Sequence, residues 1–250
     1  MQRPGDFRRY ALSQRWDSGH LRTVRRLLDP QPGTRILEVG SGRGHLTKRL
    51  DELGAIATGI DLNAEAVANA VARDIRQMSV EALDFADGEF DQLVAVHAIE
   101  HFPDLPLAMR QMARVLRPGG RALFVYPAEP IRGLFAVPDA IIIYRNPFKA
   151  RQLHRQKLRP RKVRALAAAA GLDHVHSEFQ LLSSPQFATV VRKPWALRQR
   201  EPLPAWKAPT LDVDRALGAA LDLNDPPLVP SLVRDQQEPA VRRPQRSRAI

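Results

Sequence analysis

The stretch RILEVGSGRGHL, residues 35–46, determines how the rest of the chain can be interpreted. An apolar run typical of a buried strand leads directly into a turn with three glycines, and a segment with helical spacing follows. Gly40, Gly42 and Gly44 allow a tight turn and a close approach of the backbone to a ligand, because a Cβ atom there would clash or forbid a positive φ. The stretch therefore predicts a strand, turn and helix that hold a nucleotide-like ligand.

The residues around the glycines limit which ligand fits. A dinucleotide-binding G-x-G-x-x-G motif needs a third glycine where this chain has His45, and a phosphate-binding P-loop needs a Gly-Lys-Ser/Thr sequence that this turn lacks. The carboxylate of Glu38 would repel a pyrophosphate but could accept hydrogen bonds from a cationic ligand or from loop amides. Asp61, after the apolar stretch 55–60, can bind both hydroxyls of a ribose, which would suit a nicotinamide dinucleotide equally well. The turn favours a ligand with a positively charged amino-acid end.

Apolar segments of strand length alternate with amphipathic segments of helix length along the chain. This alternation predicts an α/β fold with a parallel sheet covered by helices on both faces. We expect helices over 18–28, 45–53, 64–73, 105–116 and 159–170, and strands over 34–39, 55–60, 75–80, 91–96, 121–126, 173–182 and 186–192. Prolines interrupt the segment after Tyr126, and we expect an irregular insert there.

Five segments, in this order, resemble the successive motifs of class I S-adenosylmethionine-dependent methyltransferases. They are the glycine turn, TGID (58–61), FDQLVAVH (90–97), IEHFPD (99–104) and RVLRPGG (114–120). The resemblance covers roughly residues 21–193 and is nearest to the type 11 group, which includes quinone-biosynthesis methyltransferases. It implies a Rossmann-like fold with a seven-stranded, mostly parallel sheet whose last strand is antiparallel, and S-adenosyl-L-methionine as the co-substrate. On this basis we expect residues 1–195 to form the methyltransferase domain.

The resemblance also assigns residues to the cofactor. Glu38 and the amides of the glycine turn match positions that contact its methionine end, and Asp61 matches the position that holds the ribose. The cofactor residues implied are Glu38, Gly40, Ser41, Gly42, Gly44, Asp61, Leu62, Asp84, Phe85 and His97. Among these, Leu62 would pack on the adenine, and Asp84 and Phe85 would contact its amino group and ring face.

The candidate catalytic residues are His97, His101 and Tyr126. His97 ends the fourth expected strand, beside the sulfonium in this fold, where a histidine could deprotonate an attacking hydroxyl or amine. The position is equally consistent with a histidine that lines the pocket and takes no part in proton transfer. Tyr126 and Glu129 follow the fifth expected strand, at the edge where open α/β sheets bind substrates, so either could position an acceptor. Methyl transfer itself depends mainly on alignment, because the methyl group is already activated.

Residues 97–101 also read H-x-x-E-H, the pattern of inverted zinc proteases. That site needs both histidines on one regular helix, whereas this segment follows a strand end. Small-RNA 2′-O-methyltransferases and some quinone O-methyltransferases have an acid-x-x-Glu-His metal site in this region. Here the first ligand would be His97 instead of an acid, which disfavours Mg²⁺ because hard cations prefer oxygen ligands. We therefore expect no metal.

The formal net charge of +11 is concentrated in one part of the chain. Residues 140–172 contain no acid, and the basic residues there are Arg145, Lys149, Arg151, Arg155, Lys157, Arg159, Arg161, Lys162 and Arg164. Such a run attracts anionic partners. Its apolar neighbours favour an anionic membrane surface contacted through residues 131–164 over nucleic acid, because few aromatic residues are interleaved for base stacking. A merely solvated basic face explains the run as well.

The remaining features concern location and organisation. The chain has no cysteine, its first residues carry arginines without an apolar run, and no stretch reaches the ~20 apolar residues of a membrane span. We expect a cytoplasmic protein, with a substrate lid at residues 128–158. The Pro/Arg-rich tail 196–250, with one periodic run at 211–223, is expected to be disordered or loosely docked.

These observations predict a methyltransferase that moves a methyl group from S-adenosylmethionine to an O, N or C atom of a small, lipophilic acceptor. An RNA methyltransferase using the basic run 145–164 and a non-catalytic cofactor-binding regulatory module are the alternatives. A nicotinamide-dependent oxidoreductase is disfavoured by His45 and Glu38.

Overall fold

The computed structural model describes residues 18–131, 133–182 and 184–195. The predicted tail 196–250 lies outside these residues. In chain order the elements are α2 (Ser18–Leu28), β1 (Arg35–Val39), α3 (His45–Glu52), β2 (Ile56–Asp61), α4 (Ala64–Ala68), β3 (Ile75–Gln77), β4 (Phe90–Val96), α5 (Leu105–Val115), β5 (Leu116–Pro127), α6 (Val137–Tyr144), the 3₁₀ turn η1 (Pro147–Lys149), α7 (Ala150–Leu153), α8 (Pro160–Ala169), β6 (Asp173–Leu181) and β7 (Pro185–Arg192).

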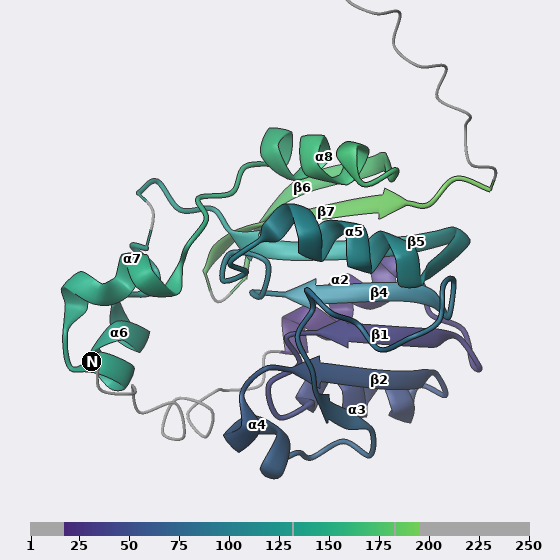
Figure 1. The fold of residues 1–250 in the computed structure, drawn as a ribbon, viewed down its shortest axis with the longest axis horizontal. Coiled ribbons are helices and arrows are strands. Elements are labelled where there is room, and N and C mark those ends of the chain that lie inside the picture. Colours follow the sequence, from purple (N-terminus) through teal and green to yellow (C-terminus); the bar gives the residue numbers. More distant parts are fainter. Residues whose placement is uncertain (1–17, 132, 183, 196–250) are drawn as a thin grey trace, which may run out of the picture. The chain divides into compact units, whose positions relative to one another are not determined.

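Seven strands form one sheet in the order β3-β2-β1-β4-β5-β7-β6. The pairs among β1 to β5 are parallel, and β7 runs antiparallel to both β5 and β6 (Figure 1). The predicted seven-stranded sheet with an antiparallel last strand is therefore confirmed. The strand order reverses direction between β1 and β4, and ligands of open α/β sheets bind at the carboxyl ends of the strands beside such a point.

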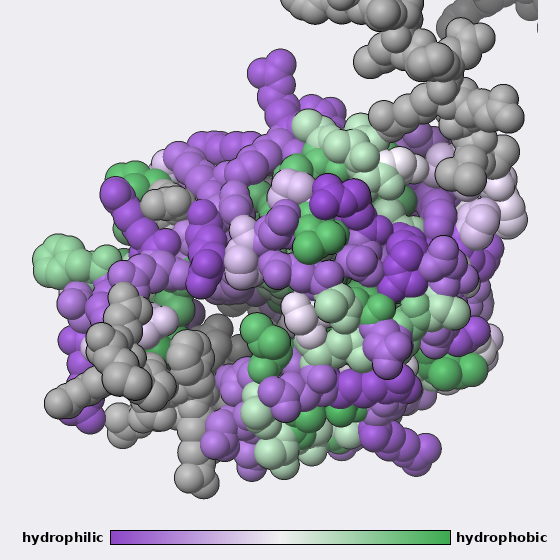
Figure 2. Space-filling model, in the orientation of Figure 1, coloured by the Kyte–Doolittle hydropathy of each residue, from purple (hydrophilic) through white to green (hydrophobic). Residues whose placement is uncertain are grey.

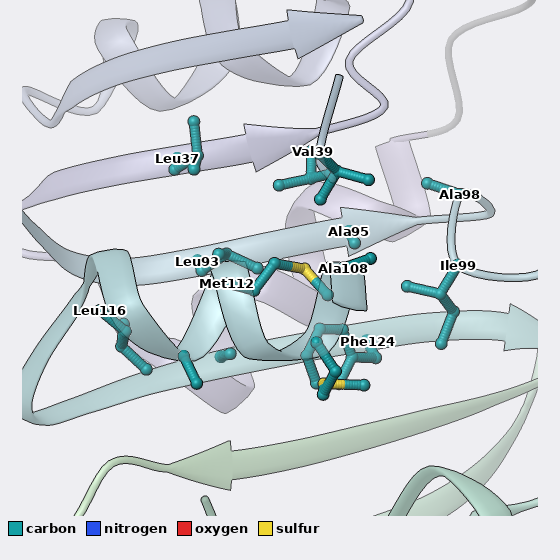
Figure 3. Packing of buried hydrophobic residues seen from close by; sticks show 14 of the residues in the cluster. Leu37, Val39, Leu93, Ala95, Ala98, Ile99, Ala108, Met112, Leu116 and Phe124 are labelled. Carbon is teal, nitrogen blue, oxygen red and sulfur yellow. The ribbon is translucent and has the colours of Figure 1, made fainter. Parts of the chain in front are cut away.

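Helices cover both faces of the sheet because alternate strand residues point to opposite sides. Leu37 and Phe124 pack beneath α5 and α8 with Met112 and Val163, whereas the neighbouring Ile36 belongs to a second apolar cluster against α2 and α3. Figure 3 shows the first cluster, with Met112 of α5 lying over Leu93 of β4. Both faces are buried, which explains the continuous apolar runs of the strands.

The helix after β2 is shorter than predicted. Residues 64–73 were expected to be helical, but α4 ends at Ala68 because Asn69 leaves the helical conformation and its side chain donates to the Glu65 carbonyl. The Val71 amide then donates to the Arg43 carbonyl at 2.8 Å. This hydrogen bond holds residues 69–73 against the glycine turn, so the helix does not continue through them.

The insert after β5 is more regular than predicted. Irregular backbone was expected there from its prolines, yet α6, η1 and α7 form within it. Pro138 and Pro147 lie in the first turns of α6 and η1, where a missing amide hydrogen costs nothing. Ala136, Ala140 and Ala150 form a small apolar core of the insert. Among the helices described, none has the length and apolar character needed to cross a membrane.

Candidate functional site

A cleft of about 580 Å³ lies at the carboxyl ends of β1, β2 and β4. One wall comes from the sheet and its loops, and the other comes from α6, α7 and Arg155 of the insert. Figure 1 shows α6 and α7 facing the strand ends that build the first wall. The residues that line the cleft include Gly40, Gly42, Asp61, Leu62, Met78, Ser79, Val80, Glu81, His97, His101, Asp139, Ile143, Tyr144 and Leu153. Its volume is within the usual range for small-ligand sites.

The glycine turn brings backbone to the cleft without side chains in the way. Gly40 has φ +73°, and a Cβ added there would lie 2.5 Å from the Cβ of Ala98. The turn amides are bonded within the protein: those of Gly40 and Ser41 both donate to the Ile60 carbonyl at 2.9 Å, and that of Gly42 donates to Asp61 at 2.8 Å. These hydrogen bonds hold the turn in shape, and a contact of its backbone with a ligand stays a prediction.

Ser41 and Gly44 lie behind the turn. Ser41 is buried, and Gly44 has φ +78° with Ile75 so close that an added Cβ would lie 2.5 Å from its Cδ1. Neither is among the described residues that line the cleft. Gly44 packs the turn against Ile75 of β3, and the ligand contact expected for both residues stays a prediction.

Asp61 and Leu62 lie in the cleft as predicted. The two carboxylate oxygens of Asp61 accept from the amides of Gly42 and Asn63, each at 2.8 Å, which fixes the carboxylate at the end of β2. Leu62 is 70% exposed. An apolar side chain held in the open beside a fixed carboxylate suits the flat ring and the ribose of a nucleoside.

Glu38 points away from the cleft. Its buried carboxyl group accepts a hydrogen bond from the Thr47 hydroxyl of α3, and it does not line the cleft among the described residues. Burial raises the pKa of Glu38 to about 7, the nearby charge of Asp61 adds to this, and hydrogen bonds from Thr47 oppose it. In this structure the side chain ties β1 to α3, and its contact with the cationic end of a ligand stays a prediction.

Asp84 and Phe85, which the resemblance assigns to an adenine, lie in different surroundings. Phe85 is buried in the core with its ring edge-on to Phe90 at 4.9 Å between centroids, and Asp84 is exposed. Neither lines the cleft in the described part of the chain. Met78 to Glu81 line the cleft instead. They follow β3 directly, so the rule that ligands meet strand ends would have found them had the strand been ended at Gln77.

His97 lies in the cleft in a left-handed conformation, with φ +50°. The Gln186 side-chain nitrogen donates to Gln180, so the Gln186 oxygen accepts from Nε2 of His97 at 2.9 Å. The other ring nitrogen, Nδ1, lies 3.6 Å from a Glu100 oxygen. The placement of His97 at the cleft agrees with the prediction, but its Nε2 is committed to Gln186.

His101 lies beside His97 in the cleft, next to two residues that the sequence did not connect with it. Its Nδ1 hydrogen-bonds the Leu153 carbonyl at 2.8 Å, and its ring meets the buried His154 edge-on at 5.0 Å. Glu100, between the histidines, is 1% exposed. Burial alone would raise the pKa of Glu100, but the neighbouring histidines His97, His101 and His154 hold it below its ordinary value.

The two residues predicted after the fifth strand do not face an acceptor. Tyr126 is 0% exposed, its hydroxyl pairs with Thr189 at 2.8 Å, and burial raises its pKa to about 12. Glu129 is buried too, and it accepts from His154 and from the amides of Gly133 and Phe135. Tyr126 belongs to the core and Glu129 holds the insert together, so both predicted positions at the cleft are wrong.

Comparison with known proteins gives these features a context. Residues 37–124 match the family model described as "Methyltransferase domain". The ubiquinone biosynthesis O-methyltransferase of Pseudomonas aeruginosa is 31% identical over 151 residues, which cover 56% of this chain and 65% of that protein. The demethylmenaquinone methyltransferase of Corynebacterium kroppenstedtii is 28% identical over 117 residues, which cover 46% of this chain and 51% of that protein. The chain thus spans less than two thirds of these curated relatives.

A solved structure supports the fold. The S-adenosylmethionine-dependent methyltransferase from Mesorhizobium loti superposes with a TM-score of 0.55 at 19% identity, covering 69% of this chain and 96% of that one. At this identity the likeness concerns the arrangement of helices and strands alone.

Proposed function

We propose that the chain transfers a methyl group from S-adenosylmethionine to a small, lipophilic acceptor, because residues 37–124 match the model of a methyltransferase domain. One observation carries the proposal: the glycine turn, Asp61 and Leu62 line a single cleft at the point where the strand order reverses, and the insert closes its other side. The coarse assignment accords with the quinone methyltransferases among its relatives.

The cofactor would occupy the wall built by the sheet. Asp61 is placed to hold the ribose hydroxyls, Leu62 to cover the adenine, and Ser79 and Glu81 to reach its edge. Gly40 would lie beside the methionine end, and close packing against Ala98 requires a glycine there. When bound, S-adenosylmethionine supplies an activated methyl group, so the residues of the chain need only to bind, orient and exclude water.

The acceptor would lie between this wall and the insert. Ile143, Tyr144 and Leu153 give that side an apolar and aromatic character, while His97 and His101 add polar atoms at one end. Such a lining fits a ring that carries a hydroxyl, such as a phenol or quinol, better than a charged polymer. In this proposal residues 128–158 form the substrate lid.

The first test is calorimetric titration of the purified chain with S-adenosylhomocysteine. We expect one saturable site, and Asp61→Ala should weaken binding at least tenfold because it removes the ribose acceptors. Asp84→Ala is the matched control, since that acid is exposed and outside the cleft. Circular dichroism melts show whether Asp61→Ala stays folded, and Asp61→Asn, which keeps an oxygen acceptor, distinguishes loss of a ligand contact from a collapsed turn. Unaltered affinity in Asp61→Ala, or no binding by folded wild type, contradicts the proposal.

A second test concerns the acceptor. Turnover is measured over a panel of phenols, quinols and short RNAs, each across a range of salt concentrations. We expect methylation of a phenol or quinol with little dependence on salt. An RNA substrate would show affinity that falls steeply with salt, because phosphate contacts release counterions. Cofactor binding without turnover of any acceptor would favour the regulatory-module alternative.

We also propose that the insert touches anionic membrane surfaces, where lipophilic acceptors reside. Phe148 is 91% exposed, and Ile131, Leu134 and Ile141 are exposed beside the basic residues of the same segment. Figure 2 shows hydrophobic and hydrophilic side chains side by side at this end of the molecule. Apolar side chains next to basic ones suit a lipid interface.

Sedimentation with lipid vesicles tests this contact. We expect binding to vesicles with anionic lipid, weaker binding to neutral vesicles, and a clear loss for Phe148→Ser. Phe179→Ser is the control, because Phe179 is 58% exposed but lies on β6. Equal loss in both variants, or no binding to anionic vesicles, contradicts the contact.

A further inference from the structure

A line of hydrogen-bonded side chains runs from the cleft toward the outer strand of the sheet. Nε2 of His97 meets the side-chain oxygen of Gln186 at 2.9 Å, and the Gln186 nitrogen donates to Gln180 at 3.0 Å. The Gln180 nitrogen donates in turn to the carboxylate of Glu178 at 2.6 Å, and Arg26 of α2 donates to the same carboxylate. Gln186 is 0% exposed. The line therefore connects a residue of the cleft, through the interior, with an ion pair between β6 and α2.

The outer end of this line fixes its direction. An ionised carboxylate can only accept hydrogen bonds. The hydrogen bond from Arg26 lowers the pKa of Glu178 to about 2, against the opposing effect of burial, so Glu178 is ionised at neutral pH. Gln180 must therefore turn its nitrogen to Glu178 and its oxygen to Gln186. Gln186 must then turn its own oxygen to His97.

This direction decides which ring nitrogen of neutral His97 carries the hydrogen. The Gln186 oxygen at 2.9 Å needs a donor, so the hydrogen lies on Nε2 and the lone pair on Nδ1. Nδ1 lies 3.6 Å from an oxygen of Glu100, and that carboxylate by itself would favour the opposite form, with the hydrogen on Nδ1. The contact with Gln186 decides, because 3.6 Å is beyond the range of a hydrogen bond. Only the form with its lone pair on Nδ1 can accept a proton there.

Other titratable groups lie near His97. The acidic, basic and histidine side chains that line the cleft with it are Asp61, Glu81, His101, Asp139 and Arg155. The ring of His20 in α2 meets it edge-on at 5.4 Å between centroids, and Glu100 is buried next to Nδ1. Burial would raise the pKa of Glu100, but the neighbouring histidines hold it below its ordinary value. The resulting negative charge stabilises the positive charge that His97 takes up when Nδ1 accepts a proton.

We propose that Gln186 is a positioning residue, which keeps the hydrogen of neutral His97 on Nε2 so that Nδ1 takes up the proton of the methyl acceptor. His97 lines the cleft, whereas Gln186 is buried and is not among the described residues that line it. The step rests on the proposed methyl transfer. As the hydroxyl oxygen of the acceptor attacks the methyl carbon, its proton passes to Nδ1 and the carbon–sulfur bond breaks with its electrons going to sulfur. His97 then releases the proton to solvent, and the products are the methyl ether and S-adenosylhomocysteine.

Nitrogen NMR reads the position of the hydrogen without cofactor or acceptor. The full chain is labelled with ¹⁵N-histidine, and the His97 signals are identified by their loss in His97→Gln. At a pH where the ring is neutral, we expect the hydrogen on Nε2 in the wild type. In Gln186→Leu the hydrogen should move to Nδ1, where Glu100 attracts it. Gln180→Leu removes only the partner that directs the Gln186 amide, so both forms of the ring should appear.

Kinetics with a methylated acceptor test the proton step. Gln186→Leu should lower kcat about tenfold or more, and Gln186→Glu, which keeps an oxygen to accept from Nε2, should recover most of this loss. The acid limb of the pH–rate profile should move to lower pH in Gln186→Leu, because the protonated ring loses an acceptor. The affinity for S-adenosylhomocysteine should not change, since Gln186 does not line the cleft.

Thr189→Val is the matched control. Thr189 is also 0% exposed and lies on β7, but its hydroxyl pairs with Tyr126, and its side chain points to the opposite face of the sheet from that of Gln186. The variant should keep the hydrogen of His97 on Nε2 and the pH profile of the wild type. Circular dichroism melts show whether each variant is folded. Should Gln186→Leu fail to fold, Gln180→Leu decides, since Gln180 is only partly buried.

Three results would overturn the positioning role: a wild-type ring with its hydrogen on Nδ1, a ring that stays doubly protonated wherever the protein is folded, or the same form of the ring in wild type, Gln186→Leu and Gln180→Leu. An equal change in Thr189→Val would overturn it too. A changed ring form with unaltered kcat and pH profile would overturn the proton transfer to Nδ1. If the wild type has the expected ring form but neither binds S-adenosylhomocysteine nor methylates any acceptor, the proposed function fails and the positioning of His97 stands.

Discussion

The two walls of the cleft are built in different ways. The sheet wall is shaped by backbone: the amides of Gly40 and Ser41 converge on the Ile60 carbonyl, and that of Gly42 meets Asp61. The insert wall is held by side chains, through Glu129 with His154 and through His101 with Leu153. Its own apolar core consists of a few alanines with Val137 and Leu153 packed against them.

This difference separates the two tasks of the site. A turn held by hydrogen bonds of its backbone amides keeps one shape in any sequence that retains its glycines. Such a turn can therefore bind a common cofactor. A wall held by a few polar side chains can be rebuilt by substitution without disturbing that turn. We therefore expect changes in the sheet wall to affect cofactor binding and stability together, and changes in the insert to affect mainly the acceptor.

Gly40→Ala should have the largest effect. Its Cβ would lie 2.5 Å from that of Ala98 in a left-handed conformation, so steric strain and backbone strain add, for about 2–5 kcal/mol of lost stability. Gly171→Ala is the control. Gly171 also has a positive φ, +83°, but nothing lies within 4 Å of the added Cβ, so we expect a loss of stability of about 1 kcal/mol. Urea unfolding and nucleoside titration measure both. Equal effects would show that close packing of the turn is unimportant.

Glu38→Gln should change how stability depends on pH. The pKa of Glu38 is raised from 4.5 to about 7 by burial, so its contribution is fully present below pH 4.5 and is lost as pH rises through 7. Relative to wild type, the variant should gain up to about 3 kcal/mol between pH 4.5 and 8. Urea unfolding across this range checks it. A constant difference between the two proteins would mean that the carboxyl group does not titrate there.

Gln152→Ala tests the insert wall alone. Gln152 is an exposed residue of α7 that lines the cleft. Losing one polar contact of about 1 kcal/mol should raise the KM of the acceptor severalfold and leave the affinity for S-adenosylhomocysteine within twofold. Steady-state kinetics and calorimetry give the two values. A matching loss of affinity for S-adenosylhomocysteine would contradict the proposal that the insert wall affects mainly the acceptor.

The smallest expected effect concerns an exposed ion pair whose two residues do not line the cleft. Glu178 pairs with Arg26, and this hydrogen bond lowers its pKa to about 2, against the opposing effect of burial. The stabilisation is present above the ordinary pKa of 4.5 and is lost as pH falls through 2. Arg26→Gln should cost about 0.2–1 kcal/mol at pH 5 and progressively less toward pH 2. Arg49→Gln, which breaks another exposed ion pair, is the control for a general loss of positive charge.

The sequence predicted the sheet wall better than the insert. Asp61 and Leu62 could be located from the sequence because they lie at the carboxyl end of a clear strand. The burial of Tyr126 was missed because side chains along a strand alternate between its two faces, so a small error in register reverses their direction. In the insert, prolines were interpreted as helix breakers, although Pro138 and Pro147 begin helical turns.

The amino-acid sequence by itself determined the strand and helix order, the glycine turn and the acid at the end of β2, because periodicity and turn chemistry act over a few residues. Tertiary structure alone decided that His154 meets Glu100 and His101, that Glu38 turns toward Thr47, and that Glu129 supports the insert. These contacts join residues far apart in the chain. The spacing of residues along a sequence does not encode such contacts, since they depend on how the packed layers fold back on one another.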